Sequence, residues 1–397
     1  MVKQIHLLIT ELREISQGIE MFKNYKFKDY DFKLIIYVVS ITVIGVFLVN
    51  SAQPDNTKKQ LMGFIAGLAI MIILSFIDYH IWLKIWFIYY FVMIGMLVAV
   101  LIGGYEALGA KRWFILFGIR FQPSEAAKIL LILFFAQFII KFKERINQWY
   151  MIIIMIALAA VPTALIYKQP DLSTTIVFGL IFLSVLFMGE INYRYFIGLA
   201  AIAIPTFIIV FILLIQPDSF LVKKEIVKPY QQIRILAWLH PDEYELEEAF
   251  QQQNSIMAIG SGRLTGKGLN NTGVNSVKKG NFISEPQTDF IFTIAGEELG
   301  FVGSATIIIL IVLITIECFF VAFRSADLPG RIIAGGMGAY IGFQSTVNIC
   351  VTTGLFPNTG IPLPFVSYGL TSLLVLYTGM GLVMNIRLQK QRKFNND

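Results

Sequence analysis

Long apolar segments recur along nearly the whole chain and are separated by shorter polar stretches. About ten of these segments are long enough to cross roughly 30 Å of membrane hydrocarbon as helices. They occupy approximately residues 33–50, 60–77, 82–103, 125–141, 149–167, 172–189, 194–216, 291–322, 331–353 and 366–386. The sequence therefore predicts an all-α polytopic membrane protein with about ten transmembrane helices. The eighth segment is longer than a span requires, so its first turns are expected at the membrane interface.

The first part of the chain has a different pattern. Apolar residues recur there at spacings of three and four, as in Ile5, Leu8, Leu12, Ile15 and Ile19. This spacing predicts an amphipathic helix, which could lie on the membrane surface, bind a partner or pack against its own chain. Because residues 1–32 lack a continuous apolar core, they do not resemble a cleavable signal peptide. We expect an amphipathic segment 1–32, a transmembrane domain 33–388 and a short tail 389–397.

Basic residues between the spans indicate the topology. They gather in the same set of loops and in the tail, at Lys141, Lys143, Arg145, Arg324, Arg331, Arg387, Lys390, Arg392 and Lys393. The positive-inside rule makes that side cytoplasmic, and an even number of spans places both termini there. The outer side then receives the loop 104–124, the turn 168–171, a large loop 217–288 and the segment 354–365.

Composition supports a membrane protein and excludes other classes. The chain is 56% hydrophobic and 15% charged, whereas soluble domains are about 25% charged. The net charge of +6 fits basic cytoplasmic loops beside an anionic membrane surface. No basic run is interleaved with aromatic residues, so we expect no nucleic-acid partner. Cys318 and Cys350 lie in apolar segments as packing residues, and the scattered His6, His80 and His240 form no metal motif.

One acidic residue lies where the large polar loop meets the eighth apolar segment. Asp289 follows Thr288 and precedes the run Phe290-Ile291-Phe292. A carboxylate at the membrane edge is costly to place, so it is a functional hypothesis by default. The alternative is that Asp289 caps the following helix and complements its dipole.

The large outer loop is too long to be without structure of its own, and residues 243–253 predict a short helix within it. Its glycine-rich segment, 260–273, is expected to approach another surface closely. This segment superficially resembles a phosphate-binding loop. The Walker pattern requires Gly-Lys-Ser/Thr between a strand and a helix, but Gly268 follows Lys267 here. We therefore reject nucleotide binding.

Cations and polar residues cluster before and within the fourth span. Pro123 suits the first turn of that helix, with Gln122 or Ser124 as its cap. Glu125 and Lys128 are three residues apart and share a helix face. The cluster is either a local ion pair with Lys and Arg side chains at the lipid headgroups, or an anion site for a phosphate or diphosphate. The cations of such an anion site would be Lys111, Arg112, Arg120 and Lys128.

Two further outer segments have distinctive backbone chemistry. The turn Lys168-Gln-Pro-Asp171 opens the sixth span, and turn chemistry alone explains most of it. The segment 348–369 is dense in glycine and proline, which predicts a rigid, non-helical re-entry before the last span. Irregular backbone at that depth must be buried in protein or line a cavity.

Five motifs together resemble one family. They are Arg120-Phe-Gln-Pro-Ser-Glu-Ala-Ala-Lys128, Gln169-Pro-Asp171, Ala258-Ile-Gly-Ser-Gly262 with Gly266-Lys-Gly268, Thr288-Asp-Phe-Ile-Phe292 with Glu297-Glu-Leu-Gly300, and Gly360-Ile-Pro-Leu-Pro-Phe-Val-Ser-Tyr-Gly369. In this order they resemble the SEDS family (shape, elongation, division and sporulation), and its rod-shape branch more than its division branch. The motifs cover nearly all of the chain after the first span.

This resemblance implies a ten-span fold with both termini inside. It also implies a peptidoglycan glycosyltransferase that polymerises lipid II into β-1,4 glycan strands on the outer face of the bacterial cytoplasmic membrane, for elongation and cell shape. The implied partners are lipid II and a class B penicillin-binding protein, the transpeptidase that crosslinks the strands. Two other functions stay open, a lipid II flippase and a non-catalytic scaffold for that transpeptidase.

By motif position, Asp289 corresponds to the essential acidic residue of the family. It would take the proton from the attacking sugar hydroxyl while cations hold the departing diphosphate. The candidate cations are Lys111, Arg112, Arg120, Lys128, Arg234 and Lys267, and the candidate supporting residues are Gln122, Ser124, Glu125, Thr288, Glu298 and Ser367. A divalent cation, Mg or Mn, bridging the diphosphate would have Asp289 or Glu125 as an oxygen ligand.

The chain departs from the family pattern at three places. Gln287 stands where the family usually has a histidine, so a proton-shuttling role at that position is in doubt here. Leu370-Thr371 follow Gly369 in place of a second glycine and a serine. The acidic run 242–248 stands where an aromatic-glycine turn is common.

Overall fold

The computed structural model describes residues 30–394 apart from short gaps at 108–109, 117–118, 217–218, 225–226, 245–247, 272, 274–275 and 277–281. The predicted amphipathic helix in residues 1–29 lies outside the described residues. The predicted boundary between spans and tail at residue 389 falls inside one continuous helix, because the last helix runs to Phe394.

Ten long helices occupy the ten apolar segments, which confirms the predicted fold class. Their bounds are α2 Phe32–Ala52, α3 Thr57–Ser75, α5 Trp86–Gly103, α6 Pro123–Lys141, α7 Trp149–Lys168, α8 Leu172–Met188, α9 Tyr193–Ile215, α13 Ile291–Phe323, α14 Leu328–Thr352 and α15 Leu370–Phe394. Within the described chain, eight candidate spans are long and apolar enough to cross a membrane, while α8 is one residue short of the required length. Helix α14 is less apolar because most of its surface packs against protein and not lipid.

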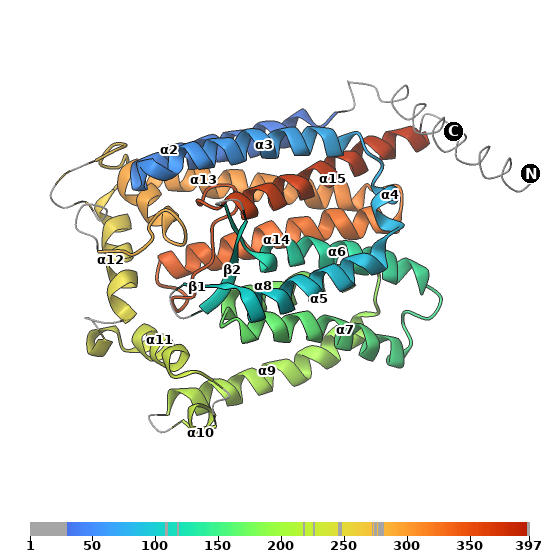
Figure 1. Cartoon of the computed structure of the whole chain (residues 1–397), viewed down its shortest axis with the longest axis horizontal. Helices are drawn as coiled ribbons and strands as arrows, with labels where there is room; N and C mark the ends of the chain where they lie inside the picture. The colour runs from blue at the N-terminus through green and yellow to red at the C-terminus, as the bar shows by residue number, and fades with distance from the viewer. Residues whose placement is uncertain are drawn as a thin grey trace, which may run out of the picture.

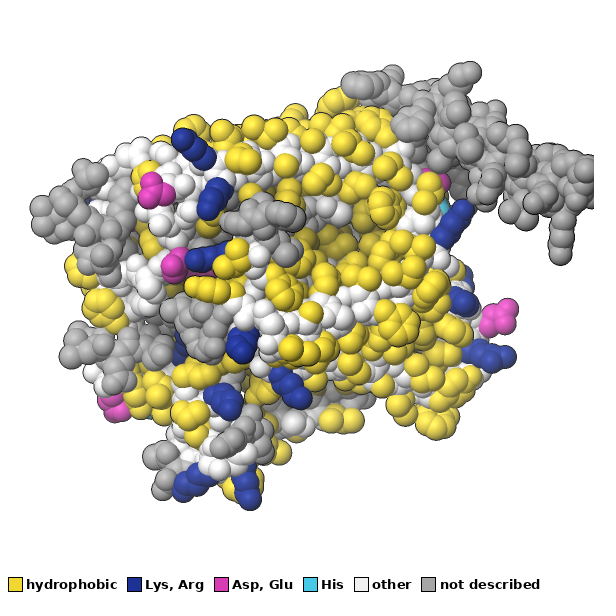
Figure 2. All heavy atoms as spheres, viewed as in Figure 1, with side chains coloured by type: hydrophobic (Ala, Val, Ile, Leu, Met, Phe, Trp, Pro, Cys, Tyr) yellow, Lys and Arg dark blue, Asp and Glu magenta, His cyan; other side chains and the backbone are white. Residues whose placement is uncertain are grey.

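The long helices run roughly parallel to one another (Figure 1). Helix α15 packs on α3, α13 on α14, α14 on α8, and α5 on α6. Helix α9 lies at the edge of the bundle (Figure 1), and Leu214 is its one buried residue. Figure 2 shows apolar side chains over a broad middle region, with Lys and Arg side chains gathered toward the two ends. This distribution matches a multi-pass membrane protein, whose charged groups lie at the water-facing ends.

Short elements cover one end of the bundle (Figure 1). Strands β1 (Tyr105–Ala107), β2 (Ala110–Leu116) and β3 (Ile119–Phe121) make a small antiparallel sheet in the order β1-β2-β3. A loop was predicted here from the sequence, because strands this short show too little alternation of apolar and polar residues to be recognised. The shorter helical elements of the chain are η2 Pro54–Asn56, α4 Tyr79–Leu83, α10 Phe220–Lys223, α11 Pro229–Leu239, η3 Pro241–Tyr244 and α12 Glu248–Ser261.

The large outer loop carries helices, as expected, but the helix predicted at 243–253 is wrong in its bounds. Element η3 ends at Tyr244, α12 runs from Glu248 to Ser261, and residues 245–247 lie outside the described residues.

Helix α13 is broken at Gly300, which has a φ of +65°. This break separates the first turns from the membrane-spanning part, as the excess length of the segment predicted. The glycine-rich segment lies directly against the break. A Cβ on Gly266 would lie 2.1 Å from the carbonyl oxygen of Glu298, and one on Gly262 would lie 1.9 Å from that of Gly296. The predicted close approach is therefore confirmed, since only glycine fits at these two positions.

Backbone hydrogen bonds from the glycine-rich segment replace those that the broken helix loses. The amides of Lys267 and Gly268 donate to the carbonyls of Glu297 and Glu298, both at 3.0 Å. On the other side of the break, the amide of Phe301 donates to the carbonyl of Arg263 at 2.8 Å. Because a buried, unpaired backbone group is costly, these contacts fix the outer loop onto α13.

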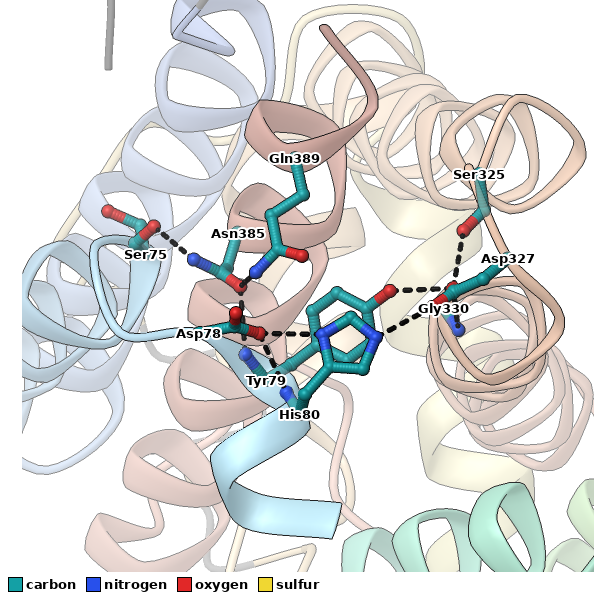
Figure 3. Close-up of polar contacts among 9 residues, drawn as sticks. All are labelled: Ser75, Asp78, Tyr79, His80, Ser325, Asp327, Gly330, Asn385 and Gln389. Atoms are coloured by element: carbon teal, nitrogen blue, oxygen red, sulfur yellow. Dashed lines mark hydrogen bonds and ion pairs between the residues drawn. The ribbon is translucent and has the colours of Figure 1, made fainter. Parts of the chain in front are cut away.

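At the opposite end of the bundle, Tyr79 and His80 together join three elements (Figure 3). His80 contacts Asp78 through Nδ1 and Asp327 through Nε2, each at 2.7 Å. The Tyr79 hydroxyl also donates to Asp327 at 2.6 Å, and the Tyr79 amide donates to Asn385 at 3.0 Å. This cluster ties α4 to the start of α14 and to α15.

The hydrogen bonds to Asp327 and Asp78 raise the pKa of His80 to about 9, above its ordinary value of about 6.5. A raised folded-state pKa adds stability that is fully present below about pH 6.5 and is lost as the pH rises through 9. Replacing His80 by Gln should therefore lower stability at pH 6 by about 1 kcal/mol, a value discounted for solvent screening because the ring is 46% exposed. Thermal melting in detergent would measure this.

The difference between native protein and His80→Gln should close above pH 9. His240→Gln serves as a control, because His240 is an exposed residue at the end of α11. A gap of constant size from pH 6 to pH 10 would show that the charge on His80 does not stabilise the cluster.

Candidate active site

The segment before α13 is held by its backbone. Three successive carbonyls, those of Gln287, Thr288 and Asp289, accept hydrogen bonds from groups in or beside the re-entrant segment. The donors are the Tyr368 amide at 2.8 Å, the Ser367 hydroxyl at 2.6 Å and the Asn348 side-chain amide at 2.8 Å. This arrangement fixes the position of Asp289 without using its carboxylate.

Residues 353–369, between α14 and α15, form the non-helical re-entrant segment that was predicted, whereas the first residues of the predicted stretch, 348–352, belong to α14. Asn348 also donates to the carbonyl of Ile361 at 2.6 Å, and the Ser367 hydroxyl accepts from the Leu363 amide at 2.7 Å. These bonds satisfy irregular backbone at membrane depth, where an unpaired group would be costly. The predicted supporting role of Ser367 therefore has a physical basis, because its hydroxyl joins the two segments.

The Asp289 carboxylate points at Gly360. A Cβ on Gly360, which has a φ of +65°, would lie 2.8 Å from Asp289 Oδ2. Phe290 occupies the N-cap of α13 and no side chain caps that helix, so the capping interpretation of Asp289 is wrong. No described residue donates a hydrogen bond to this carboxylate. The group is thus positioned by its surroundings and left available.

Charges around Asp289 act in opposite directions. Burial and the nearby carboxylate of Asp171 raise its pKa to about 6, with a smaller contribution from Glu285, while Arg112 and Arg234 oppose the rise. A pKa near the working pH is what general base catalysis requires. The site therefore contains a carboxylate that is ionised at neutral pH and still basic enough to accept a proton.

Arg112 reaches this region from strand β2. Its Nε donates to the carbonyl of Gln169 at 2.8 Å, and its guanidinium also contacts the carbonyl of Pro170. Asp171 then caps α8 by accepting from the Thr174 amide at 3.1 Å. The turn 168–171, which the sequence explained by turn chemistry, thus brings a second carboxylate toward Asp289.

Arg234 reaches the same region from helix α11. Its guanidinium lies over the ring of Tyr230, 5.6 Å from the centroid. The Tyr230 hydroxyl donates to the carbonyl of Pro170 at 3.4 Å, so α11 is anchored on the same turn. Of the six predicted cations, Arg112 and Arg234 are the two whose charges act on Asp289.

Lys128 lies elsewhere, inside the helix bundle. Its side chain is fully buried, and Nζ donates to Glu125 and to Gln344, both at 2.6 Å. The second Glu125 oxygen accepts from the Tyr340 hydroxyl at 2.7 Å and from Ser372 at 3.1 Å. The ion-pair interpretation of Glu125 and Lys128 is therefore confirmed. The other prediction for Lys128 was that it binds a phosphate or diphosphate, but its buried side chain is occupied by Glu125 and Gln344.

Lys267 lies at the break in α13, where its Nζ pairs with Glu297 at 2.9 Å. Glu298 is buried and accepts from the Ser51 hydroxyl at 2.6 Å, which joins α13 to the end of α2. The Asn270 amide donates to the same carboxylate at 3.2 Å. Through these contacts, Lys267 and Glu298 hold the outer loop against α13.

Four other predicted residues lie near the sheet and the start of α6. Lys111 and Arg120 are exposed, and the Arg120 carbonyl accepts from Thr371 at 2.9 Å. Helix α6 begins at Pro123 as predicted, but Gln122 makes no capping hydrogen bond with its side chain. The Ser124 hydroxyl is buried without a partner among the described residues. Thr288, in the segment before α13, closes its own turn by donating to the Glu285 carbonyl at 3.0 Å.

The described residues do not fit a resident metal. No three His, Cys, Asp or Glu side chains among them converge as ligands. Glu125, one of the two predicted ligands, has its oxygens engaged by Lys128, Tyr340 and Ser372. Of the two predicted oxygen ligands, only Asp289 has a carboxylate that these contacts do not occupy.

Two members of the site, Asn348 and Asp171, were not among the predicted site residues. The Asn348 side chain donates hydrogen bonds both to the segment before α13 and to the re-entrant segment. The sequence did carry a signal for it, because an amide side chain is unusual in an otherwise apolar span. Asp171 affects the pKa of Asp289, but nothing in the sequence places these two distant residues together.

Comparison with known proteins identifies the family of this chain. Residues 31–392 match the family model of FtsW, RodA and SpoVE, described as cell cycle proteins. A probable peptidoglycan glycosyltransferase FtsW of Geobacter sulfurreducens is 32% identical, covering 90% of this chain and 95% of that protein. The peptidoglycan glycosyltransferase MrdB of Escherichia coli K12 is 33% identical, covering 90% and 93%.

Solved structures show the same architecture. A chain from a peptidoglycan synthase complex, described as coordinating polymerization and crosslinking, superposes with a TM-score of 0.74 at 27% identity over 91% of this chain and 98% of that one. The rod shape determining protein RodA of Thermus thermophilus superposes with a TM-score of 0.65 at 25% identity over 90% and 96%. The chain therefore belongs to the SEDS family of FtsW, RodA and SpoVE proteins.

Proposed function

We propose that this protein is a peptidoglycan glycosyltransferase that polymerises lipid II into β-1,4 glycan strands on the outer face of the cytoplasmic membrane during cell-wall elongation. One observation carries the proposal. The Asp289 carboxylate has a raised pKa, its backbone is fixed by the re-entrant segment, and two guanidinium groups act on it. The names of the related proteins support the same reaction.

In this reaction the sugar hydroxyl of an incoming lipid II attacks the anomeric carbon of the donor. The new glycosidic C–O bond forms as the bond from that carbon to the diphosphate oxygen breaks. The hydroxyl proton passes to Asp289, and the polyprenyl diphosphate leaves with its electron pair. Attack from the opposite face converts the α-linked donor into a β-linked product, for which one base is sufficient.

The leaving diphosphate needs positive charge more than it needs a proton. Arg112 and Arg234 are the cations best placed for it, because both already act on Asp289. Exposed Lys111, on the same strand as Arg112, and Arg120 at the end of the sheet could guide the anion toward them. We assign Lys128 and Lys267 to ion pairs with Glu125 and Glu297 instead of the diphosphate.

The topology follows from the same assignment. If the site faces outward, the opposite end, which carries Arg331 and Arg387, is cytoplasmic, as the positive-inside rule requires. Asp31 and Arg387 are in contact there, so the start of α2 and the end of α15 lie on one side. This supports both termini being cytoplasmic.

A class B penicillin-binding protein is the partner that this function requires, because new strands must be crosslinked as they form. The solved synthase complex, which couples polymerization with crosslinking, supports such an assembly for this chain.

Replacing Asp289 by Asn tests the base role directly. The change is nearly isosteric but removes the proton acceptor, so polymerisation of purified lipid II in detergent should fall by about 10²–10⁴-fold. Glu285→Gln, in the same turn, is the matched control and should stay within a few-fold of the native rate. Full activity of Asp289→Asn would disprove the base role, and lipid movement without glycan product in native protein would favour a flippase.

The polymerisation rate should also depend on pH with a defined sign. Because burial raises the pKa of Asp289 to about 6, the base is protonated and inactive at lower pH. The rate should therefore fall as the pH drops through about 6 and level off above 7. A profile that stays flat down to pH 4.5, near the ordinary range of an aspartate, would contradict the raised pKa.

Neighbouring charges should move this midpoint in opposite directions. Arg112→Gln removes a cation that lowers the pKa of Asp289, so the midpoint should shift above pH 6. Asp171→Asn removes a carboxylate that raises it, so the midpoint should shift below pH 6, and Asn still caps α8. Lys111→Gln, beside Arg112, should leave the midpoint in place. Shifts of Arg112→Gln and Asp171→Asn in the same direction would refute the assigned charge network.

A further inference from the structure

Helix α14 directs two buried amide side chains at the re-entrant segment. Gln344 and Asn348 are four residues apart, so they lie one above the other on the same face of the helix. The Gln344 side-chain nitrogen donates to the carbonyl of Pro362 at 2.9 Å. The Asn348 side-chain nitrogen donates to the preceding carbonyl, that of Ile361, at 2.6 Å. Two neighbouring carbonyls of the re-entrant segment are therefore held by two successive turns of α14.

The backbone that these bonds hold has unusual conformations. Gly360 and the buried Phe365 both have a φ of +65°, which is rare for a bulky residue and persists only where the surroundings fix it. Pro362 and Pro364 provide no backbone N–H groups. The segment therefore depends on donors from neighbouring helices, and within it Gly360 is the residue that the Asp289 carboxylate approaches.

A buried ion pair sets the orientation of the Gln344 amide. The amide oxygen accepts from Lys128 Nζ at 2.6 Å, and a lysine ammonium offers only donors. The amide nitrogen must therefore face the other way, toward the Pro362 carbonyl. Lys128 is itself fixed by Glu125 at 2.6 Å, and none of these three side chains is more than 1% exposed. Only one orientation of the amide satisfies both of its neighbours.

We propose that Gln344 is a positioning residue for Asp289, which acts through the re-entrant segment and not by contact with substrate. Its side chain connects the ion pair inside the bundle to Pro362, and Gly360, two residues earlier, lies against the carboxylate. Without this connection the segment is released from α14 at Pro362, and the carboxylate loses a fixed neighbour. The inference rests on the proposed role of Asp289 as the base and identifies a part of the bundle that sets its geometry.

A purely structural role for Gln344 would have a different consequence. Replacing an amide that only satisfies Lys128 would destabilise the bundle but leave each folded molecule as active as before. Asn385 provides the matched control, because it is fully buried at the opposite end of the bundle and donates to the carbonyl of Ser75 at 2.8 Å. Asn385→Leu should therefore lower the melting temperature and keep the native kcat.

The experiment replaces Gln344 by Met in the full chain, because Met has a similar length and cannot donate a hydrogen bond. Polymerisation of purified lipid II is measured per folded molecule, with the folded fraction taken from gel filtration and thermal melting. We expect kcat to fall by about 10- to 100-fold, since a misplacement of about 1 Å can cost that much. KM for lipid II should stay within about two-fold, because substrate contacts are unchanged.

The pH profile gives a second readout, which lost stability alone would not move. Burial is the largest cause of the raised pKa of Asp289, so a loosened segment that admits water should shift the midpoint of the rate below pH 6. The charged groups that act on Asp289 are the same in every variant, namely Asp171, Glu285, Arg112 and Arg234. Gln344→Asn, which is too short to bond both neighbours, should lower kcat and the midpoint in the same direction.

Gln344→Asn keeps the test informative if Gln344→Met does not fold. A native kcat or a native midpoint in the folded variant would overturn the proposal, as would equal changes in Asn385→Leu. Loss of activity in Asp289→Asn together with native behaviour of the Gln344 variants would overturn this proposal alone. Full activity of Asp289→Asn would instead disprove the base role on which it rests.

Discussion

Three consecutive backbone carbonyls, those of residues 287–289, are bonded to donors on or next to the re-entrant segment, and the outer site depends on this contact. Both segments are irregular backbone at the edge of a membrane, where unpaired polar groups are costly. Each segment satisfies the other through Asn348, Ser367 and the Tyr368 amide. The consequence is a fixed backbone at Asp289 with a carboxylate that no described residue bonds.

This separation of tasks explains how the site can be both rigid and reactive. Preorganised groups act strongly on a reaction because they need not reorganise when charge develops. At Asp289 the backbone supplies the rigidity, while burial, Asp171 and Arg112 set the pKa of the side chain. The glycine at position 360 allows the carboxylate to approach, since a side chain there would occupy its place.

Much of the fold could be predicted from the sequence because it follows from local signals. Hydrophobic length identified ten spans, Pro123 marked the start of α6, and the three-residue spacing of Glu125 and Lys128 identified their ion pair. The glycine-rich segment was also expected to approach another surface. What the sequence could not provide were contacts between distant residues, such as Asp171 with Asp289 or His80 with Asp327. The sequence also could not distinguish lysines that form ion pairs, such as Lys128 and Lys267, from cations that would face a substrate.

The bundle also explains why polar residues persist inside its helices. Glu125, Lys128, Tyr340 and Gln344 satisfy one another, so the charges are paired and the helices α6 and α14 are held in register. Replacing one of these residues would leave its partners buried and unpaired. The free energy lost in this way exceeds the net contribution of the intact ion pair to stability.

The most direct measurement is an experimental structure of this protein with bound polyprenyl diphosphate and a lipid II acceptor. Our account predicts that the diphosphate lies against Arg112 and Arg234, with the acceptor hydroxyl within about 3.2 Å of the Asp289 carboxylate. A diphosphate bound at the opposite end of the bundle, or an acceptor remote from Asp289, would contradict it.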